Sequence, residues 1–235
     1  MIRTIKDICA GVLDLVYPPF CLVCGRRDQN YLCAKCIEEI DVIDAPFCRK
    51  CGTPCEEYKC QQCLEREYHF EYARSAAVFG GALREAIHSL KYKFHLPLAD
   101  PLADLMARCF HETYLAGRVD LAIPIPIHSS RLLERGFNQA EELALRLRKR
   151  ISLPVESGVL YKPRKTRHQV DLPQDLRTIN VQGAFAVRNT GRIAGKRILL
   201  IDDVFTTGST LSEAARVLRE AGAETVHAYT LSRSV

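Results

Sequence analysis

The sequence predicts an α/β fold, a parallel sheet flanked by helices, with a small cysteine-rich module at its N-terminal end. Strand-like apolar runs alternate with helical segments from about residue 71 onward, and eight cysteines recur in C-x2-C pairs before residue 64. Alternating strands and helices imply a parallel sheet covered on both faces. We therefore predict two domains: residues 1–70, with a helix and the cysteine module, and residues 71–235, with the sheet.

The elements of the second domain follow from its periodicity and its turn residues. The expected strands are residues 72–79, 120–127, 159–163, 197–204 and 225–233. The expected helices are residues 82–93 and 98–116, a helix that ends near residues 146–150, and residues 209–221. Residues 164–187 are polar and basic without clear periodicity, so we expect them to connect two strands.

Composition is ordinary for a soluble globular protein, with 47% hydrophobic and 26% charged residues among 235. No apolar run approaches the roughly 20 residues needed to span a bilayer. Residues 1–20 are apolar at helical spacing, are interrupted by Asp7 and Asp14, and lack a signal-peptide cleavage site. We interpret them as a short amphipathic helix packed on its own domain. The alternative is a peripheral contact with a membrane.

The net charge of +5 is unevenly distributed. Residues 1–70 carry 9 Lys and Arg against 11 Asp and Glu, whereas residues 129–170 carry 10 against 4. Two interpretations of this basic excess are compatible with each other. One is a pocket for pyrophosphate, and the other is a surface for nucleic acid backbone.

Eight of the eleven cysteines form an internal repeat, C-x2-C-x8-C-x2-C, that occurs twice. A C-x2-C turn presents two thiolates, and two such turns complete a tetrahedral Zn²⁺ site without an open position, so the sites are structural. The loops between the pairs are too short to form a core, so the metal supplies the folding energy. The predicted zinc ligands are Cys21, Cys24, Cys33, Cys36, Cys48, Cys51, Cys60 and Cys63.

The pairing of these cysteines is open to two interpretations. Sequential pairing gives two separate Cys₄ sites, which we prefer, and interleaved pairing gives a cross-braced module. Disulfides in a secreted protein are the alternative to metal, and the missing export signal disfavours them. Cys9 and Cys109 lie in apolar helical contexts and are expected in the core, whereas Cys55 is an alternative ligand.

Residues 198–211, ILLIDDVFTTGSTL, are the most informative stretch of the sequence. An apolar strand ends at two adjacent carboxylates, Asp202 and Asp203, and a hydroxyl-rich loop then leads into a helix near Ser209. Ligands bind at the carboxyl ends of strands in open α/β sheets, and a helix N-terminus offers free N–H groups to phosphate. The carboxylates suit the vicinal hydroxyls of a sugar. The stretch therefore predicts a site for a sugar phosphate.

The same stretch resembles the signature of type I phosphoribosyltransferases, which bind phosphoribosyl pyrophosphate (PRPP). The resemblance implies that Asp202 and Asp203 hold the ribose hydroxyls. It also implies that PRPP is the ligand and that Mg²⁺ accompanies it, because this ion prefers oxygen ligands and is commonly carried by phosphates. The residues implied to hold the 5′-phosphate are Thr206, Thr207, Gly208, Ser209 and Thr210.

The resemblance also assigns roles to two loops. Residues 126–135 occupy the place of a pyrophosphate loop, where Arg131 and Arg135 supply forked donors, unless this is a basic loop on a solvated face. We count Arg135 with the acid pair as catalytic, and Lys91 as either a phosphate ligand or part of a solvated helix face. Residues 164–185 are expected to be a lid that excludes water. Its candidate contacts are Thr166, Gln169, Arg177 and Asn180.

The combination of motifs resembles the ComF family. Its elements are the double C-x2-C module, then LKYKF, R-x3-RGFNQ, Q-x7-R-x2-N-x2-GAF and IDDVFTTGST, over roughly residues 17–233. The resemblance implies a type I phosphoribosyltransferase fused behind a double zinc ribbon. It further implies a cytoplasmic protein of DNA uptake in natural transformation, with single-stranded DNA and DNA-uptake proteins as partners.

Two functions are compatible with the sequence. The first is a PRPP-dependent transferase, although Thr206 stands where many purine-salvage enzymes carry an acid, so purine salvage is not expected. The second is a non-catalytic protein that binds single-stranded DNA and keeps the PRPP site as a sensor or phosphate clamp. Stacking aromatics such as Tyr58, Tyr68 and Phe70 support the second, unless they simply pack around the metal loops.

Overall fold

The computed structural model describes residues 20–111, 113, 115–166 and 179–235. Our predictions for the N-terminal helix, for Cys9, and for Gln169 and Arg177 therefore lie outside the described residues. Among the described residues, no helix combines the length and the apolar character needed to cross a membrane.

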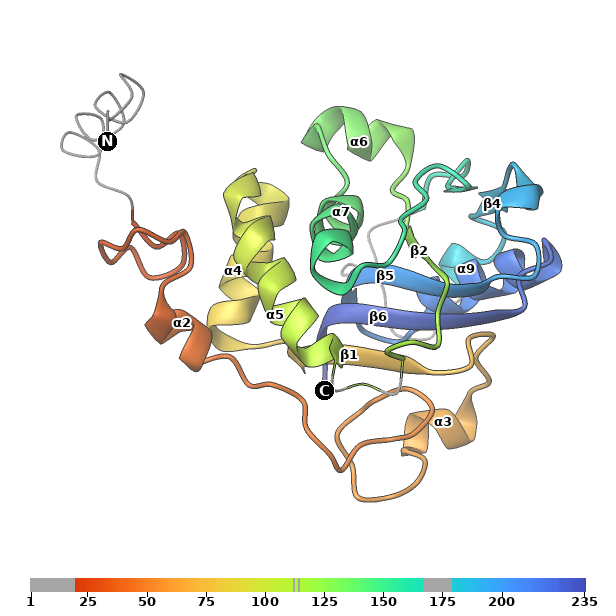
Figure 1. Ribbon diagram of the computed structural model, residues 1–235, viewed down its shortest axis with the longest axis horizontal. Helices are drawn as coiled ribbons and strands as arrows, with labels where there is room; N and C mark the ends of the chain where they lie inside the picture. Colours follow the sequence, from red (N-terminus) through yellow and green to blue (C-terminus); the bar gives the residue numbers. More distant parts are fainter. Residues whose placement is uncertain (1–19, 112, 114, 167–178) are drawn as a thin grey trace.

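A parallel sheet forms the centre of the molecule, in the order β1-β6-β5-β2 (Figure 1). Its central strands are β5 (Arg197–Phe205) and β6 (Thr225–Arg233), flanked by β1 (Ala73–Val78) and β2 (Leu121–Pro124). Residues 198–201 of β5 are fully buried, as expected for a strand covered on both faces. The predicted α/β class with a parallel sheet is confirmed.

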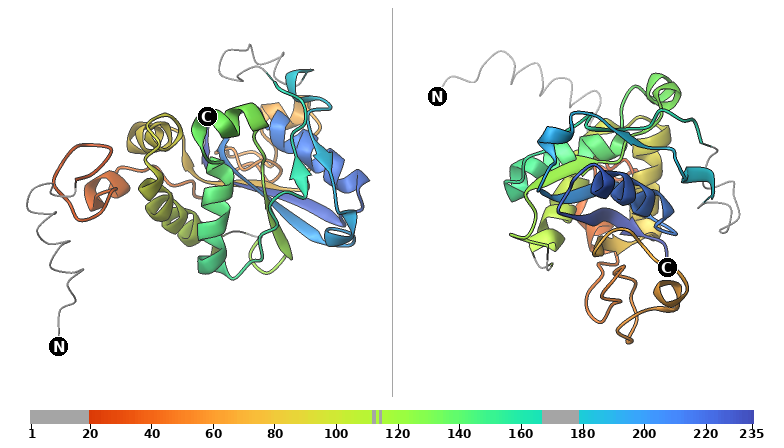
Figure 2. Two further views of the ribbon diagram at one scale, coloured as in Figure 1. Left: turned by 90° about the horizontal axis from the view of Figure 1, so that it is seen from above. Right: turned by 90° about the vertical axis from the view of Figure 1, so that its right-hand side faces the viewer.

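Helices cover the sheet on both faces, and alternate residues of β5 enter two different cores (Figures 1 and 2). Leu199 and Ile201 pack with α4 (Gly81–Tyr92), α5 (Ala99–His111) and α7 (Gln139–Ile151). Ile198 and Leu200 pack with α9 (Ser209–Glu220) on the opposite face. This two-sided burial holds the carboxyl end of β5 in a fixed position between α4, α7 and α9.

The two cysteine repeats belong to different cores: the first lies beyond α4 and the second lies below β1 (Figure 1). The first repeat, with α2 (Ala34–Glu38), packs through Leu32 into the core that contains α4. The second repeat, with α3 (Gln61–Glu65), lies beside β1 and joins the core that contains α9. We refer to these as the first ribbon (residues 20–40) and the second ribbon (residues 47–70).

The segment expected to be a pyrophosphate loop contains a helix, α6 (Ser129–Arg135), so that expectation was incomplete. The helix begins because the Nδ1 atom of His128 accepts a hydrogen bond from the backbone N–H of Ser130 at 3.2 Å. It ends at Gly136, whose φ of 79° closes the helix in a left-handed conformation. His128 therefore acts as a helix cap.

Other boundaries differ from the prediction for local reasons. β2 ends at Pro124, since this residue and Pro126 beyond it lack the N–H groups that a sheet requires. The strand expected at residues 159–163 shortens to β3 (Leu160–Tyr161), which pairs antiparallel with β4 (Ala186–Val187). The short helices η1 (Leu96–Leu98) and η3 (Thr190–Arg192) were not predicted. The β3–β4 pair forms the base of the expected lid.

Candidate functional site

Three elements meet at the carboxyl end of β5. Asp202 is partly buried and Asp203 is 4% exposed. The ammonium group of Lys91, at the end of α4, forms an ion pair with the Asp203 carboxylate. The side-chain amide of Gln139, at the start of α7, lies 3.5 Å from Oδ1 of the same carboxylate. Asp203 is thus held by two other elements, whereas Asp202 is the more accessible of the pair.

The two carboxylates differ in their affinity for protons. Burial alone would raise the pKa of Asp203, but the Lys91 ammonium and its hydrogen bonds hold that pKa below the ordinary value. Burial, followed by the neighbouring charge of Asp203, raises the pKa of Asp202 well above the ordinary value. The site therefore pairs a carboxylate that stays ionised, Asp203, with one that takes up a proton more readily, Asp202.

The hydroxyl-rich loop after β5, residues 206–210, forms the start of α9. Gly208 caps the helix with a φ of 76°, and the hydroxyl oxygens of the buried Thr207 and Ser209 lie 2.9 Å apart. A helix N-terminus concentrates N–H donors and partial positive charge, which favours an anion. This geometry is compatible with the predicted phosphate group, and we call residues 206–210 the phosphate loop.

The two predicted arginines both lie on α6, near the acid pair. The guanidinium of Arg135 donates to Oε1 of Gln139 at 2.5 Å and lies 5.6 Å from the centre of the Tyr92 ring. The guanidinium of Arg131 donates to the carbonyl of Thr166, at the start of the expected lid, at 3.4 Å. Gln139 therefore connects Arg135 to the acid pair, and Arg131 connects α6 to Thr166.

Two residues of this site were missed by sequence reasoning. Gln139 stood in the RGFNQ motif, but nothing in the sequence placed it against Asp203. Lys162 follows β3, and burial together with the charge of Arg131 lowers its pKa to about 8, while the charge of Asp202 opposes that shift. Lys162 also borders a cavity of about 560 Å³ beside the carboxyl end of β2. No local pattern signals such a lysine, because its place depends on how β3 folds back.

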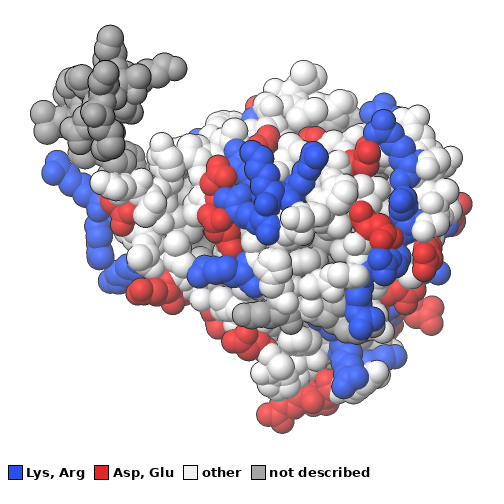
Figure 3. All heavy atoms as spheres, in the orientation of Figure 1, with Lys and Arg blue, Asp and Glu red and all other residues white. Residues whose placement is uncertain are grey.

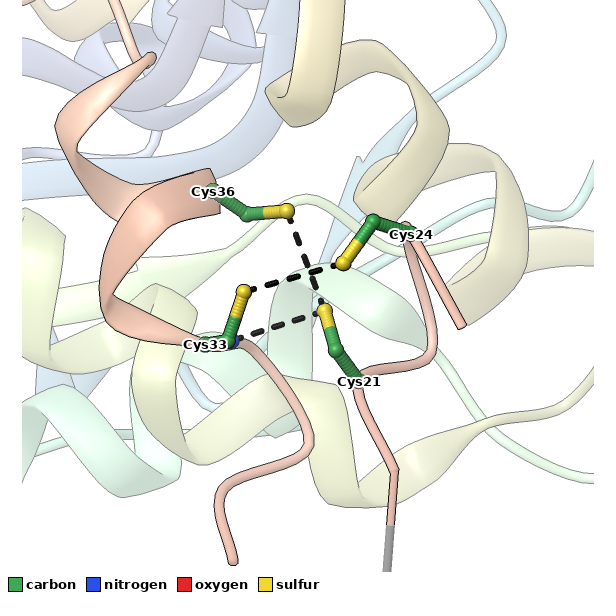
Figure 4. A group of neighbouring side chains, drawn as sticks. All are labelled: Cys21, Cys24, Cys33 and Cys36. Atoms are coloured by element: carbon green, nitrogen blue, oxygen red, sulfur yellow. Dashed lines mark hydrogen bonds between the residues drawn. The ribbon is translucent and has the colours of Figure 1, made fainter. Parts of the chain in front are cut away.

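The eight predicted cysteines gather into two groups of four, in the order of the chain. In the first group the Sγ atoms of Cys21 and Cys36 lie 3.8 Å apart and those of Cys24 and Cys33 lie 3.7 Å apart (Figure 4). Four thiolates about 2.3 Å from a zinc ion form a tetrahedron with edges of about 3.8 Å. Both groups therefore fit zinc, in the sequential arrangement rather than the interleaved one.

The second group shows the same geometry, since the Sγ atoms of Cys51 and Cys60 lie 3.5 Å apart. Its members are Cys48, Cys51, Cys60 and Cys63, and all four Sγ atoms lie within 4.8 Å of one another. Cys55 is outside this group and donates instead to the carbonyl of Glu57 at 3.3 Å. Cys109 packs against the core that contains α4, α5 and α7, as predicted.

Part of the basic excess in residues 129–170 is structural. Arg146 and Arg150 of α7 form ion pairs with Asp100 and Asp104 of α5. Over the face shown in Figure 3, Lys and Arg side chains stand beside Asp and Glu side chains. The cation in contact with the acid pair is instead Lys91, the charge of Asp202 acts on Lys162, and Arg135 reaches the pair through Gln139.

Each half of the chain matches a known domain family. Residues 12–64 match the double zinc ribbon domain, and residues 132–234 match the phosphoribosyl transferase domain. Among solved structures, the chain is similar to a glutamine PRPP amidotransferase of B. subtilis, with 23% identity and a TM-score of 0.39. That similarity covers 57% of this chain and 26% of the other.

Two curated relatives match part of the chain. The DNA utilization protein YhgH of Shigella flexneri is 30% identical over 164 residues, which are 68% of this chain and 71% of that protein. Competence protein F of Haemophilus influenzae is 33% identical over 113 residues, which are 48% of this chain and about half, 49%, of that protein. With its double zinc ribbon followed by a phosphoribosyltransferase domain, the chain belongs to the ComF family.

Proposed function

We propose that the carboxyl edge of the sheet binds Mg²⁺–PRPP. The observation that carries this proposal is the continuity of Asp202 and Asp203 with the phosphate loop at the start of α9. The two carboxylates accept hydrogen bonds from the ribose hydroxyls, and the phosphate loop holds the 5′-phosphate. Arg135 and Arg131 hold the pyrophosphate, because a guanidinium donates in pairs to phosphate oxygens. The eight grouped cysteines bind two structural zinc ions.

The site supports transfer of the phosphoribosyl group. The bond from C1′ to the pyrophosphate oxygen breaks, its electron pair leaves with pyrophosphate, and an acceptor nucleophile bonds to C1′ and loses its proton. Mg²⁺ supplies charge neutralisation on the leaving pyrophosphate. Arg135, held by Gln139, positions that group, and the lid excludes water from a cationic intermediate.

We assign this activity to the handling of incoming DNA. The names of the relatives, a competence protein and a DNA utilization protein, support this assignment. With this role we propose a cytoplasmic protein that works with proteins of DNA uptake, and a peripheral contact with the inner face of the membrane is the alternative location.

Calorimetric titration with Mg²⁺–PRPP tests the binding site. We expect the double variant Asp202→Asn/Asp203→Asn to bind at least about 100-fold more weakly, because two charge-assisted hydrogen-bond acceptors lose their charge. Asp100→Asn is the matched control, since that exposed carboxylate pairs with Arg146 on α7, and its affinity should be unchanged. If the double variant binds Mg²⁺–PRPP as tightly as the native chain, the acid pair does not bind the ribose.

Affinity for PRPP should fall as the pH is lowered, and this fall should begin at a pH where ordinary aspartates are still ionised. The raised pKa of Asp202 means that this carboxylate takes up a proton above the usual value of about 3.9, and the neutral form is a poorer acceptor. Calorimetry from about pH 5 to about pH 8 checks this, a range where ordinary aspartates are ionised. The single variant Asp202→Asn controls for titration of PRPP itself, and an identical pH profile would contradict the expectation.

A second candidate function is binding of single-stranded DNA, with the PRPP site as a sensor. It is supported by the basic excess in residues 129–170, while Thr206, in place of the acid that many purine-salvage enzymes use, argues only against a purine acceptor. The aromatic evidence for it is reduced, since Phe70 is fully buried and Tyr68 stacks on it, while Tyr58 is 65% exposed. A transferase releases pyrophosphate in the presence of its acceptor. A binder shows salt-sensitive DNA affinity that survives the acid-pair variant.

A further inference from the structure

The second ribbon directly contacts the phosphate loop. The hydroxyl of Tyr68 donates to the backbone carbonyl of Thr207 at 2.9 Å, across 139 positions of sequence. The ring of Tyr68 also lies against Gly208, where an added Cβ would come within 2.9 Å of Tyr68 Cε1 and 2.5 Å of Phe205 Cζ. Only glycine fits between these two rings, so the ribbon forms one wall of the loop.

An aromatic cluster joins the ribbon to the end of β5. The ring of Tyr68 stacks on that of Phe70, with centroids 4.8 Å apart. Both rings pack edge-to-face with the ring of Phe205, whose centroid lies 6.4 Å from that of Tyr68 and 6.1 Å from that of Phe70. Phe205 is the last residue of β5 and directly precedes the phosphate loop. A shift of the ribbon therefore moves the residue from which the loop starts.

Arg233 connects the same cluster to the second cysteine group. This last residue of β6 is 1% exposed, and its guanidinium lies 4.0 Å from the centre of the Phe205 ring. It donates to the backbone carbonyl of Cys51 at 2.9 Å and to Oε1 of Gln62 at 3.2 Å, and it lies 3.4 Å from Cys51 Sγ. A buried cation needs such partners, because its desolvation is costly. Four thiolates around a zinc ion carry net negative charge, which fits this position.

We infer that Tyr68 and Arg233 are positioning residues that make the shape of the phosphate loop depend on the second ribbon. This inference rests on the proposed PRPP site. The first ribbon packs instead into the other core, the one that contains α4. The two ribbons therefore differ in function: the second ribbon orders the loop that holds the 5′-phosphate.

Hydrogen–deuterium exchange tests the coupling without any ligand. We expect backbone amides of residues 205–212 to exchange several-fold faster in Tyr68→Phe and in Arg233→Lys than in the native chain. Tyr68→Phe removes only one hydroxyl, so it retains the stacked ring and the fold. Tyr58→Phe is the matched control, since this tyrosine belongs to the same ribbon, is 65% exposed and lies beneath Arg49; exchange should be unchanged.

Binding of two ligands separates positioning from a general loss of stability. Tyr68→Phe should weaken Mg²⁺–PRPP about fivefold, the effect of one lost hydrogen bond, and leave the affinity for Mg²⁺–pyrophosphate unchanged. Equal loss for both ligands would overturn the positioning role, as would unchanged loop exchange in both variants. If exchange rises while the native chain binds no PRPP, the coupling holds and the proposed function fails.

Discussion

Replacing Lys91 with methionine should destabilise the protein by about 3 kcal/mol, because it leaves a buried carboxylate without its cation. Lys91 is the residue that forms an ion pair with Asp203, whose side chain is 5% exposed. The loss should appear as a lower midpoint in denaturant unfolding with an unchanged slope. Lys93→Met is the matched control, since Lys93 is exposed two residues along the same segment and its removal should cost little.

A double variant identifies the cause of this loss. Adding Asp203→Asn to Lys91→Met removes the uncompensated charge, so it should restore most of the stability lost in the single variant. The pKa of Asp203 should also rise in Lys91→Met, since the ammonium is what holds it low against burial. If the two lysine variants unfold at the same denaturant concentration, the ion pair contributes nothing to the fold.

The acid pair and the phosphate loop could be predicted because they are local. A buried strand, two carboxylates, a loop and a helix follow one another within residues 198–220, so sequence order alone sets their relative positions. The cysteine groups were predictable for the same reason, because each C-x2-C pair forms one turn and the two pairs are eight residues apart.

Features that depend on tertiary packing could not be predicted. The sequence gives no reason for Lys91 to meet Asp203, because that contact requires α4 and β5 to converge at one end of the sheet. Lys162 approaches the site only because β3 folds back to pair with β4. The contact between Tyr68 and Thr207 joins what we predicted to be two separate domains. In each case the partners are distant in sequence and carry no shared motif.

Removing one zinc ligand from each ribbon should have unequal consequences. Cys36→Ala and Cys63→Ala each should lower the zinc content by one ion per chain, as measured by atomic absorption. Binding of structural zinc contributes about 10–16 kcal/mol of apparent free energy in zinc-finger peptides, so the affected ribbon should lose its order in either case. What differs is the part of the sheet domain that each ribbon covers.

Loss of the first ribbon should leave the sheet domain folded, because α4, α5 and α7 still cover that face. Loss of the second ribbon should lower the melting temperature of the sheet domain itself. Phe70 is fully buried in the core with Ile198 and Leu200, and Arg233 would lose its partners at Cys51. Exchange of the amides in β5 should therefore accelerate in Cys63→Ala and stay native in Cys36→Ala. The side chains of the second ribbon fill the core beneath the phosphate loop. Similar exchange in the two variants would therefore contradict this prediction, because it would mean that the second ribbon does not stabilise the sheet domain.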